Sequence, residues 1–300
     1  MRILIAGATG LIGKELVEEC LDLGIKIHYL TTRKNKLENK EEYQGFYWNP
    51  SKGIIDDTAF NGVSAIINLA GASVSKRWTS SYKKEILNSR TQTANLIYNT
   101  LKKLEHSVTH YISASGISIY PSSFTNLYQE TSNEEAQTFL GEVVKSWETA
   151  ADQFSDLNIK VAKVRTGIVL SEKGGALQQM VKPIKLSVGA PLGSGEQWQS
   201  WIHINDMARL YIYILKNQLT GVYNAVSPNP VTNKKMTHII AHYYDKPLWL
   251  PNIPKFMITI LLGEMGSIAL ESQLVSSEKI VKEGFQFQFV NLENALEDLL

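Results

Sequence analysis

The sequence has little cysteine, almost no net charge and no long apolar run. Its single cysteine, Cys20, rules out an internal disulfide framework and is typical of the reducing cytoplasm, where we expect the protein to act. A formal net charge of +1 argues against a nucleic-acid or membrane surface that works through bulk charge. The apolar stretch at residues 256–262 is far shorter than the ~20 residues that cross a bilayer. We therefore expect a soluble globular protein that binds a small molecule and holds no metal.

A glycine-rich turn stands at the start of the chain. Residues 2–6 form a short apolar run that predicts a buried strand, and a helical pattern begins at Leu11. Between them lie Gly7, Gly10 and Gly13. Glycine permits a sharp turn and close approach of a phosphate, and the start of a helix attracts anions through its N–H groups and dipole. The spacing differs from the usual Gly-x-Gly-x-x-Gly fingerprint, but the place between strand and helix favours nucleotide binding over a structural turn.

A basic segment follows the second predicted strand, residues 26–30. In a dinucleotide-binding unit this strand ends beside the adenosine ribose, where an acid binds a free 2′-hydroxyl and an arginine accommodates a 2′-phosphate. The chain has Arg33 and Lys34 there, and its next acid is Glu38. Because arginine can pair with phosphate through two hydrogen bonds, Arg33 predicts NADP in preference to NAD. The alternative is a solvated loop cation.

Apolar runs separated by helical patterns predict an α/β fold, a doubly wound parallel sheet of the Rossmann type. The predicted strands are residues 2–6, 26–30, 44–48, 63–69, 108–112 and 159–165, and the main helices are expected at 11–23, 79–104 and 134–154. We assign residues 1–167 to this domain, with further contributions from about 196–226. Residues 168–300 form a smaller, interleaved and mostly helical lobe, with a strand-like break at 284–289. Within it, the helical region 252–300 either covers the cleft or forms the face of a homodimer.

Two groups of residues have the chemistry or the spacing of a catalytic site. Ser113 and Ser115 follow the run at 108–112, and hydroxyls at the carboxyl end of a central strand lie where open α/β sheets bind ligands. Serines are also common in ordinary loops, so this position alone does not decide their role. Tyr98 and Lys102, four residues apart in the helix at 79–104, match a Tyr/Lys pair by spacing only. We treat that match as a coincidence, since any amphipathic helix offers such pairs.

The chain resembles an extended short-chain dehydrogenase/reductase. Within that superfamily it is similar to the epimerase-like family often labelled cell-division-inhibitor-like, which has a characteristic C-terminal helical region. The similarity covers nearly the whole chain, and the order of its motifs makes it specific. The motifs that carry it lie at residues 7–13, 68–71, 76–78, 89–90, 113–120, 139–148, 165–170, 174–177, 193–198, 201–203 and 284–285.

This resemblance implies an NADP-binding domain with a substrate lobe over the carboxyl ends of the strands. The residues along the pyrophosphate would be Thr9, Gly10, Leu11 and Ile12, within the turn from Gly7 to Gly13. The adenosine would lie beside Leu69, Ala70 and Gly71, and the nicotinamide ribose beside Ser113. Arg165 would approach the cofactor or a substrate phosphate, unless it forms a structural ion pair.

Ser115 matches the superfamily's catalytic serine, which hydrogen-bonds the substrate oxygen. We expect the substrate, a small polar molecule of unknown identity, to lie in a cleft that Gln197, Trp198, Trp201 and His203 help to shape.

One departure from the superfamily pattern concerns the reaction itself. The proton-transfer tyrosine and its lysine, aligned on Trp147 and Glu148, fall at Phe139 and Val143. Phenylalanine cannot transfer a proton, and valine has no charge with which to lower a neighbouring pKa. Tyr120 could take the place of the acid or base, although a packed aromatic is the simpler interpretation. Two functions therefore remain open: an NADP-dependent epimerase or reductase, and a non-catalytic NADP(H)-sensing regulator that acts through a protein partner.

Overall fold

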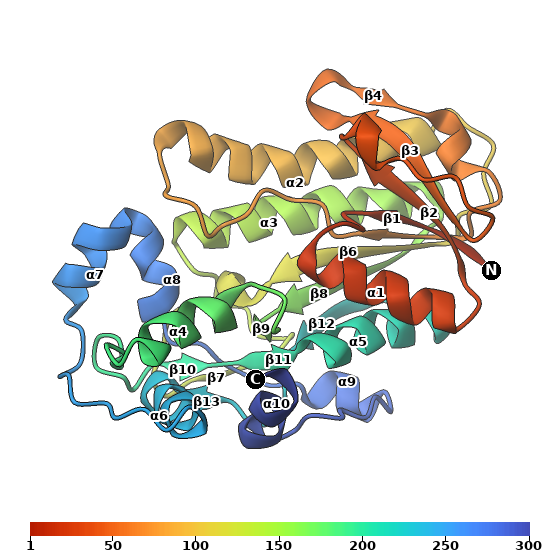
Figure 1. The fold of residues 1–300 in the computed structure, drawn as a ribbon. Coiled ribbons are helices and arrows are strands. Elements are labelled where there is room, and N and C mark those ends of the chain that lie inside the picture. Colours follow the sequence, from red (N-terminus) through yellow and green to blue (C-terminus); the bar gives the residue numbers. More distant parts are fainter.

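An eight-stranded sheet forms the centre of the computed structural model, which describes residues 1–300 (Figure 1). The strand order is β12-β8-β6-β5-β1-β2-β3-β4. All neighbours are parallel except β3 and β4. The strands are β1 (Arg2–Ala6), β2 (Lys26–Thr31), β3 (Tyr43–Asn49), β4 (Ile54–Ile55), β5 (Ala65–Asn68), β6 (His110–Gly116), β8 (Lys160–Thr166) and β12 (Gly221–Ala225). This confirms the predicted doubly wound parallel sheet.

The order of the strands reverses at β1, which pairs with β2 on one side and with β5 on the other. In open α/β sheets the connections leave this point in opposite directions, so a crevice opens outside the carboxyl ends of the two strands. The carboxyl end of β1 is Ala6, which pairs with Leu30 and Asn68. The three segments that follow these residues therefore meet at one edge of the sheet.

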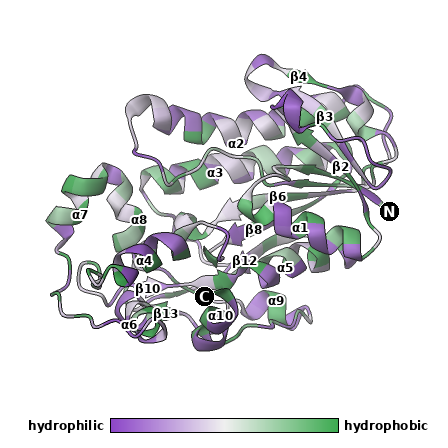
Figure 2. Ribbon diagram, viewed as in Figure 1, coloured by the Kyte–Doolittle hydropathy of each residue, from purple (hydrophilic) through white to green (hydrophobic).

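Two layers of helices cover the sheet. On one face lie α1 (Leu11–Asp22) and α5 (Ile204–Lys216), and on the other lie α2 (Ser80–Leu101) and α3 (Phe139–Asp152) (Figure 1). Each face buries its own apolar cluster, the first around Ile3, Ile5 and Leu16 and the second around Leu4, Ile66 and Ile97. Successive strand residues point to opposite faces, which is why Ile3 and Leu4 belong to different clusters. Figure 2 shows hydrophobic and hydrophilic residues mixed along α1, as an amphipathic helix requires.

The remaining elements form the smaller lobe. Two short pairs of strands belong to it: β9 pairs in parallel with β11, and β10 pairs antiparallel with β13. A third apolar cluster contains residues of α4, α6 and α10, and Leu11 and Ile12 of α1 pack against it. The lobe's elements are α4 (Ala176–Lys185), α6 (Asn233–Tyr243), α7 (Lys255–Leu262), α8 (Ser267–Leu270), α9 (Glu278–Lys282), α10 (Leu292–Leu299), β9 (Ile168–Leu170), β10 (Trp198–Gln199), β11 (Trp201–His203), β13 (Val231–Thr232) and the pair β7 (Leu127–Tyr128) with β14 (Leu274–Val275). None of the helices has both the length and the apolar character that a membrane crossing demands.

Three of the differences between the predicted elements and the structure bear on the site or on the C-terminal lobe. β6 runs to Gly116 because Ser113–Gly116 continue the ladder with β8, so both serines lie within the strand rather than after it. Helix α3 begins at Phe139, where the Thr138 hydroxyl accepts the N–H of Gly141 at 3.2 Å. Residues 284–289 are not a strand. The buried carboxylate of Asp206 accepts the N–H groups of Gln288 and Phe289, both at 2.9 Å, and so replaces a strand partner.

Candidate functional site

A cleft of about 1220 Å³ opens at the crevice between β1 and β5. The predicted residues Gly7, Thr9, Gly10, Arg33, Leu69, Ala70 and Gly71 all line it. One wall, which the sequence did not suggest, is the face of α2 that carries Glu85, Asn88, Ser89, Gln92 and Thr93. The carboxyl ends of four neighbouring strands, β5, β1, β2 and β3, and the sides of α1 and α2 thus line a space with both polar and apolar walls.

The glycine turn has a conformation that only glycine allows. Gly7 has φ +90°, and a Cβ there would lie 2.9 Å from the carbonyl carbon of Leu69. A Cβ on Gly13 would lie 2.1 Å from the carbonyl oxygen of Gly7. These contacts are shorter than any real Cβ makes, so larger residues would push β5 and α1 away from the turn. The glycines therefore bring the start of α1 against the end of β1.

The start of α1 offers unused hydrogen-bond donors to the cleft. Gly10 precedes the helix and has no side chain to cap it, and the amide of Lys14 is the one that bonds the Gly10 carbonyl, at 3.0 Å. The amides of Leu11, Ile12 and Gly13 belong to the first turn, whose N–H groups have no acceptor inside a helix. The side chains of Leu11 and Ile12 do not line the cleft, and Gly13 has none, so any contribution from these three residues is made through the backbone.

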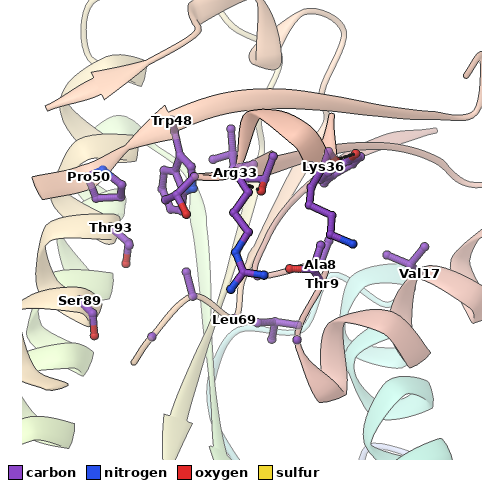
Figure 3. Close-up of a pocket in the computed structure, with 18 of the residues that line it drawn as sticks. Ala8, Thr9, Val17, Arg33, Lys36, Trp48, Pro50, Leu69, Ser89 and Thr93 are labelled. Carbon is purple, nitrogen blue, oxygen red and sulfur yellow. Dashed lines mark hydrogen bonds between the residues drawn. The ribbon is translucent and has the colours of Figure 1, made fainter. Parts of the chain in front are cut away.

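Two cations, Arg33 and Lys36, point into the cleft from the segment that follows β2 (Figure 3). Neither has a carboxylate partner, whereas Lys40 on the same wall pairs with Glu38 at 2.7 Å. In Figure 3 both side chains reach toward the turn at Ala8 and Thr9. Arg33 was predicted from the sequence and Lys36 was not, although the run of basic residues at 33–36 was the signal. Two unpaired cations beside free helix amides form a strongly anion-binding wall.

The hydroxyls at the carboxyl end of β6 are buried and already hydrogen-bonded. Ser113 donates to the carbonyl oxygen of Ala114 at 2.9 Å, and Ser115 donates to Oε1 of Glu148 at 2.6 Å. Neither serine lines the cleft described above. The single proton of Ser115 is donated to a carboxylate, so its oxygen presents lone pairs and acts as an acceptor. In that state Ser115 can accept a hydrogen bond from a substrate hydroxyl, whereas it has no proton left to donate to a substrate carbonyl.

Arg165 forms an ion pair with the same carboxylate. Its Nε and Nη2 donate to the two oxygens of Glu148 at 2.8 and 2.9 Å, and its Nη1 donates to the Tyr120 hydroxyl at 2.8 Å. Of the two roles considered for Arg165, the structure shows the ion pair. Burial opposes ionisation of Glu148, but the hydrogen bonds and charge of Arg165 outweigh it and hold the pKa of Glu148 below its usual value.

Tyr120 completes this buried network and is inaccessible to a substrate. The side chain is 1% exposed, and its hydroxyl donates to Asn224 Oδ1 at 2.8 Å while it accepts from Arg165. Burial raises the pKa of the Tyr120 phenol even though Arg165 opposes the shift. A buried phenol that keeps its proton and donates it to an amide is a packing element here, which corrects its assignment as an acid or base.

The four residues expected at the substrate cleft do not lie together in an open space. Trp201 and His203 are 0% exposed; Trp201 donates to the carbonyl of Asn229, and His203 stacks on Phe289 at 3.8 Å between ring centres. These two assignments are corrected, because a side chain sealed in the core cannot touch a ligand. Gln197 is also buried, but its Oε1 has no partner. Trp198 is half-buried and donates to the carbonyl of Phe124.

Helix α3 carries no tyrosine, and its one lysine, Lys145, is an exposed residue paired with Glu135 at 2.7 Å. Phe139 packs edge-on against Trp78 with ring centres 5.1 Å apart, and Lys83 lies over its ring. Lys83 also pairs with Glu264, so the beginning of α2 contacts the C-terminal region. Val143 is buried. The beginning of α3 is therefore packed against the segment at the start of α2, and neither Phe139 nor Val143 offers a proton donor there.

The sheet order, the glycine turn at the reversal point and the cations beyond β2 together define a nucleotide-binding protein with a Rossmann fold. A family model described as the NAD dependent epimerase/dehydratase family matches residues 3–226. The chain belongs to this family. A second model, a domain of unknown function (DUF1731), matches residues 253–299, which covers the C-terminal helices.

Known proteins with similar sequences or structures fit this assignment. The chain is 35% identical over 300 residues to an epimerase family protein of Staphylococcus aureus (strain MRSA252), and the match covers 99% of this chain and 98% of the relative. The crystal structure of the human epimerase family protein SDR39U1 (isoform 2) with NADPH is 28% identical with a TM-score of 0.86, and covers 100% of this chain and 99% of its own. UDP-glucose 4-epimerase of Thermus thermophilus, in complex with NAD, shares the fold at 16% identity and a TM-score of 0.77, with 98% and 96% of the two chains covered.

Proposed function

We propose that the protein binds NADP(H) in the cleft at β1 and β5, and that it acts with this cofactor as an epimerase or reductase on a small polar substrate. The residues that line the cleft fit NADP(H). The glycine turn has no room for a Cβ at Gly7 or Gly13, and the open amides of α1 suit a pyrophosphate. Leu69, Ala70 and Gly71 lie across the crevice, where they would flank the adenosine.

The observation that carries the preference for NADP(H) is the pair of unpartnered cations that line the cleft after β2. A 2′-phosphate is the only group that distinguishes NADP from NAD, and it needs a cation at the end of β2. Arg33 and Lys36 lie there without a carboxylate. The human relative was solved with NADPH and the Thermus epimerase with NAD, so the two cofactors occur on the same fold and the local side chains decide between them.

The test is a comparison of Arg33→Ala with Lys34→Ala by titration with NADPH and with NADH. Lys34 is the matched control, because it is the neighbouring cation but stands over the ring of Tyr47 at 5.1 Å and does not line the cleft. A hydrogen bond to a charged group contributes about 1.5–3 kcal/mol. We therefore expect Arg33→Ala to lower the affinity for NADPH roughly 10- to 100-fold and to leave the affinity for NADH unchanged. Equal NADPH and NADH affinities in the wild type, unaltered by Arg33→Ala, would refute the assignment.

When bound, the cofactor supplies or accepts a hydride; the residues of this chain hold and orient the reactants. Ser115 presents an acceptor, since its proton is donated to Glu148, and an acceptor suits a substrate hydroxyl better than a carbonyl. If Ser115 is catalytic, Ser115→Ala should reduce turnover of an identified substrate without changing NADPH affinity. Unchanged turnover would remove Ser115 from the mechanism.

A second candidate function is an NADP(H)-responsive regulator that acts through a partner protein. The observation that favours it is the chemistry around α3: the helix has no tyrosine, and Tyr120 is buried in hydrogen bonds. A crystal structure with NADPH separates the two functions. A deep polar pocket that faces C4 of the nicotinamide supports the enzyme, whereas side chains that cover C4 support the regulator.

A further inference from the structure

Arg90, near the middle of α2, is held in one orientation by three contacts. Its Nη1 donates to the carbonyl oxygens of Ile86 at 2.8 Å and Ala72 at 3.2 Å. Its guanidinium lies over the ring of Trp147, 4.8 Å from the ring centre. The stem and one nitrogen are therefore fixed by α2, by the segment after β5 and by α3, so the remaining N–H groups have a defined direction.

No carboxylate compensates this charge. Arg90 takes part in no ion pair, and burial lowers the pKa of its guanidinium to about 10. Its Nε and Nη2 make no hydrogen bond within the protein, yet neither is sealed from solvent. The Nε1–H of Trp147, in the ring beneath, is buried and also has no acceptor. Nearly all buried donors in proteins are paired, so the Nε1–H of Trp147 marks a place where an acceptor is missing, and the solvent-accessible Nε and Nη2 of Arg90 belong to the residue stacked on it.

Arg90 lies between the wall of the cleft and α3. On one side it contacts a residue that lines the cleft, since a Cβ on Gly71 would be 3.1 Å from the Arg90 Cζ. On the other side lies the ring of Trp147 in α3. An anion on the open edge of Arg90 would thus stand beside the wall of the cleft at Gly71.

We propose that Arg90 is the anchor of an anion subsite, and that it binds a phosphate or carboxylate oxygen through Nε and Nη2. The group comes either from an acidic substrate or from the diphosphate of the dinucleotide. This inference rests on the proposed function for the cleft and makes it more specific: the anion is either an acid group of the substrate or the diphosphate of the bound cofactor. A planar guanidinium with two parallel N–H groups is the geometry that such oxygens prefer.

The experiment is calorimetric titration of the NADPH-saturated protein with sodium phosphate and with sodium malonate. In the saturated protein, bound NADPH occupies Arg33 and Lys36, so phosphate and malonate can bind only at the remaining cations. The variants are Arg90→Met, which keeps the stem over Trp147, and Arg90→Lys, which keeps the charge but lacks the fork. Arg77→Met is the matched control, because Arg77 is an exposed arginine in the segment between β5 and α2. Circular dichroism and melting temperature verify that each variant folds.

If the anion belongs to a substrate, phosphate or malonate binds the NADPH-saturated wild type and Arg77→Met alike, binds Arg90→Met at least tenfold more weakly, and Arg90→Lys falls between. NADPH affinity is then equal in all variants. If the anion is the cofactor's diphosphate, Arg90→Met lowers the affinities for NADPH and NADH by the same factor, about tenfold. Phosphate and malonate then do not bind the NADPH-saturated protein. Equal binding of NADPH, phosphate and malonate by Arg90→Met and wild type overturns the proposal.

Failure of the proposed function would give a different result. If NADPH does not bind the wild type at all, the cofactor assignment is wrong, and the probes are titrated into nucleotide-free Arg33→Ala with and without Arg90→Met. A tenfold difference between these two proteins still supports the Arg90 subsite, and no difference removes it.

Discussion

The two halves of the sheet's carboxyl edge both contain polar and charged residues, but these are unpaired in one half and paired with one another in the other. At the ends of β1, β2 and β5, cations and helix amides face a cleft without partners. At the ends of β6 and β8, a serine, a tyrosine, an arginine and a glutamate satisfy one another in a buried network. A polar group is available to a ligand when the protein leaves it unpaired, and it supports the fold when the protein pairs it. The first half is built to bind, and the second is built to hold β6, β8 and α3 together.

The variant with the largest expected effect breaks the buried ion pair between Glu148 and Arg165. Glu148→Leu leaves Arg165 buried without its carboxylate, and removal of one partner of a buried ion pair costs about 3–5 kcal/mol. We expect the free energy of unfolding in urea to fall by about that amount, with NADPH affinity of the folded fraction unchanged. The double variant Glu148→Leu/Arg165→Met should recover part of the loss. A stable Glu148→Leu protein with weakened NADPH binding would place the network in the binding site instead.

The glycine turn can be tested at Gly13. Its added Cβ would meet backbone atoms 2.1 Å away, and forcing extra atoms into a packed site costs about 1–3 kcal/mol. Gly13→Ala should therefore lower the free energy of unfolding and weaken NADPH, because α1 must move away from the turn. Gly24→Ala, beyond the other end of α1, is the control: no atom lies within 4 Å of its Cβ, and only its φ of +68° is unfavourable. If NADPH binds both variants equally, the turn does not position the cofactor.

The dependence of stability on pH at acidic values tests the buried network of Ser115, Glu148 and Arg165. The pKa of Glu148 is lower in the folded protein than its ordinary 4.5, so its contribution is complete above that value and is lost as the pH falls through the folded pKa. We expect the melting temperature of the wild type to drop below about pH 4.5 more steeply than that of Glu148→Gln. Parallel curves would mean that Glu148 titrates normally.

The smallest expected effect concerns Lys36, the cation that was not predicted from the sequence. An exposed lysine beside a phosphate contributes less than a bidentate arginine, so Lys36→Ala should weaken NADPH by roughly two- to tenfold. The double variant with Arg33→Ala should abolish the preference over NADH. Lys40→Ala is the control, since its charge is already paired with Glu38. A Lys36→Ala protein with wild-type affinity would leave Arg33 as the sole recognition residue.

The fold was largely predictable because its signals are local. Alternating apolar runs and helical patterns indicated the parallel sheet, and three glycines between a strand and a helix indicated the turn. The partners of polar residues were not predictable. Ser115, Glu148 and Arg165 are far apart in the sequence, and nothing in their spacing indicates that one carboxylate would bind the other two. The same applies to His203 and Trp201, whose place in the core depends on Phe289 and Asn229.

The packing of Leu11 and Ile12 has a consequence for the order in which the protein can form. These two residues begin α1, yet their side chains rest on the cluster that contains Leu292, Leu296 and Leu299 of α10. During synthesis the glycine turn leaves the ribosome first, and the surface that supports it leaves nearly a whole chain later. Domains commonly fold from the N-terminus as they emerge, but here the first helix gains its full support only when the last one arrives. A chain cut short before α10 would therefore lose support at its own nucleotide turn.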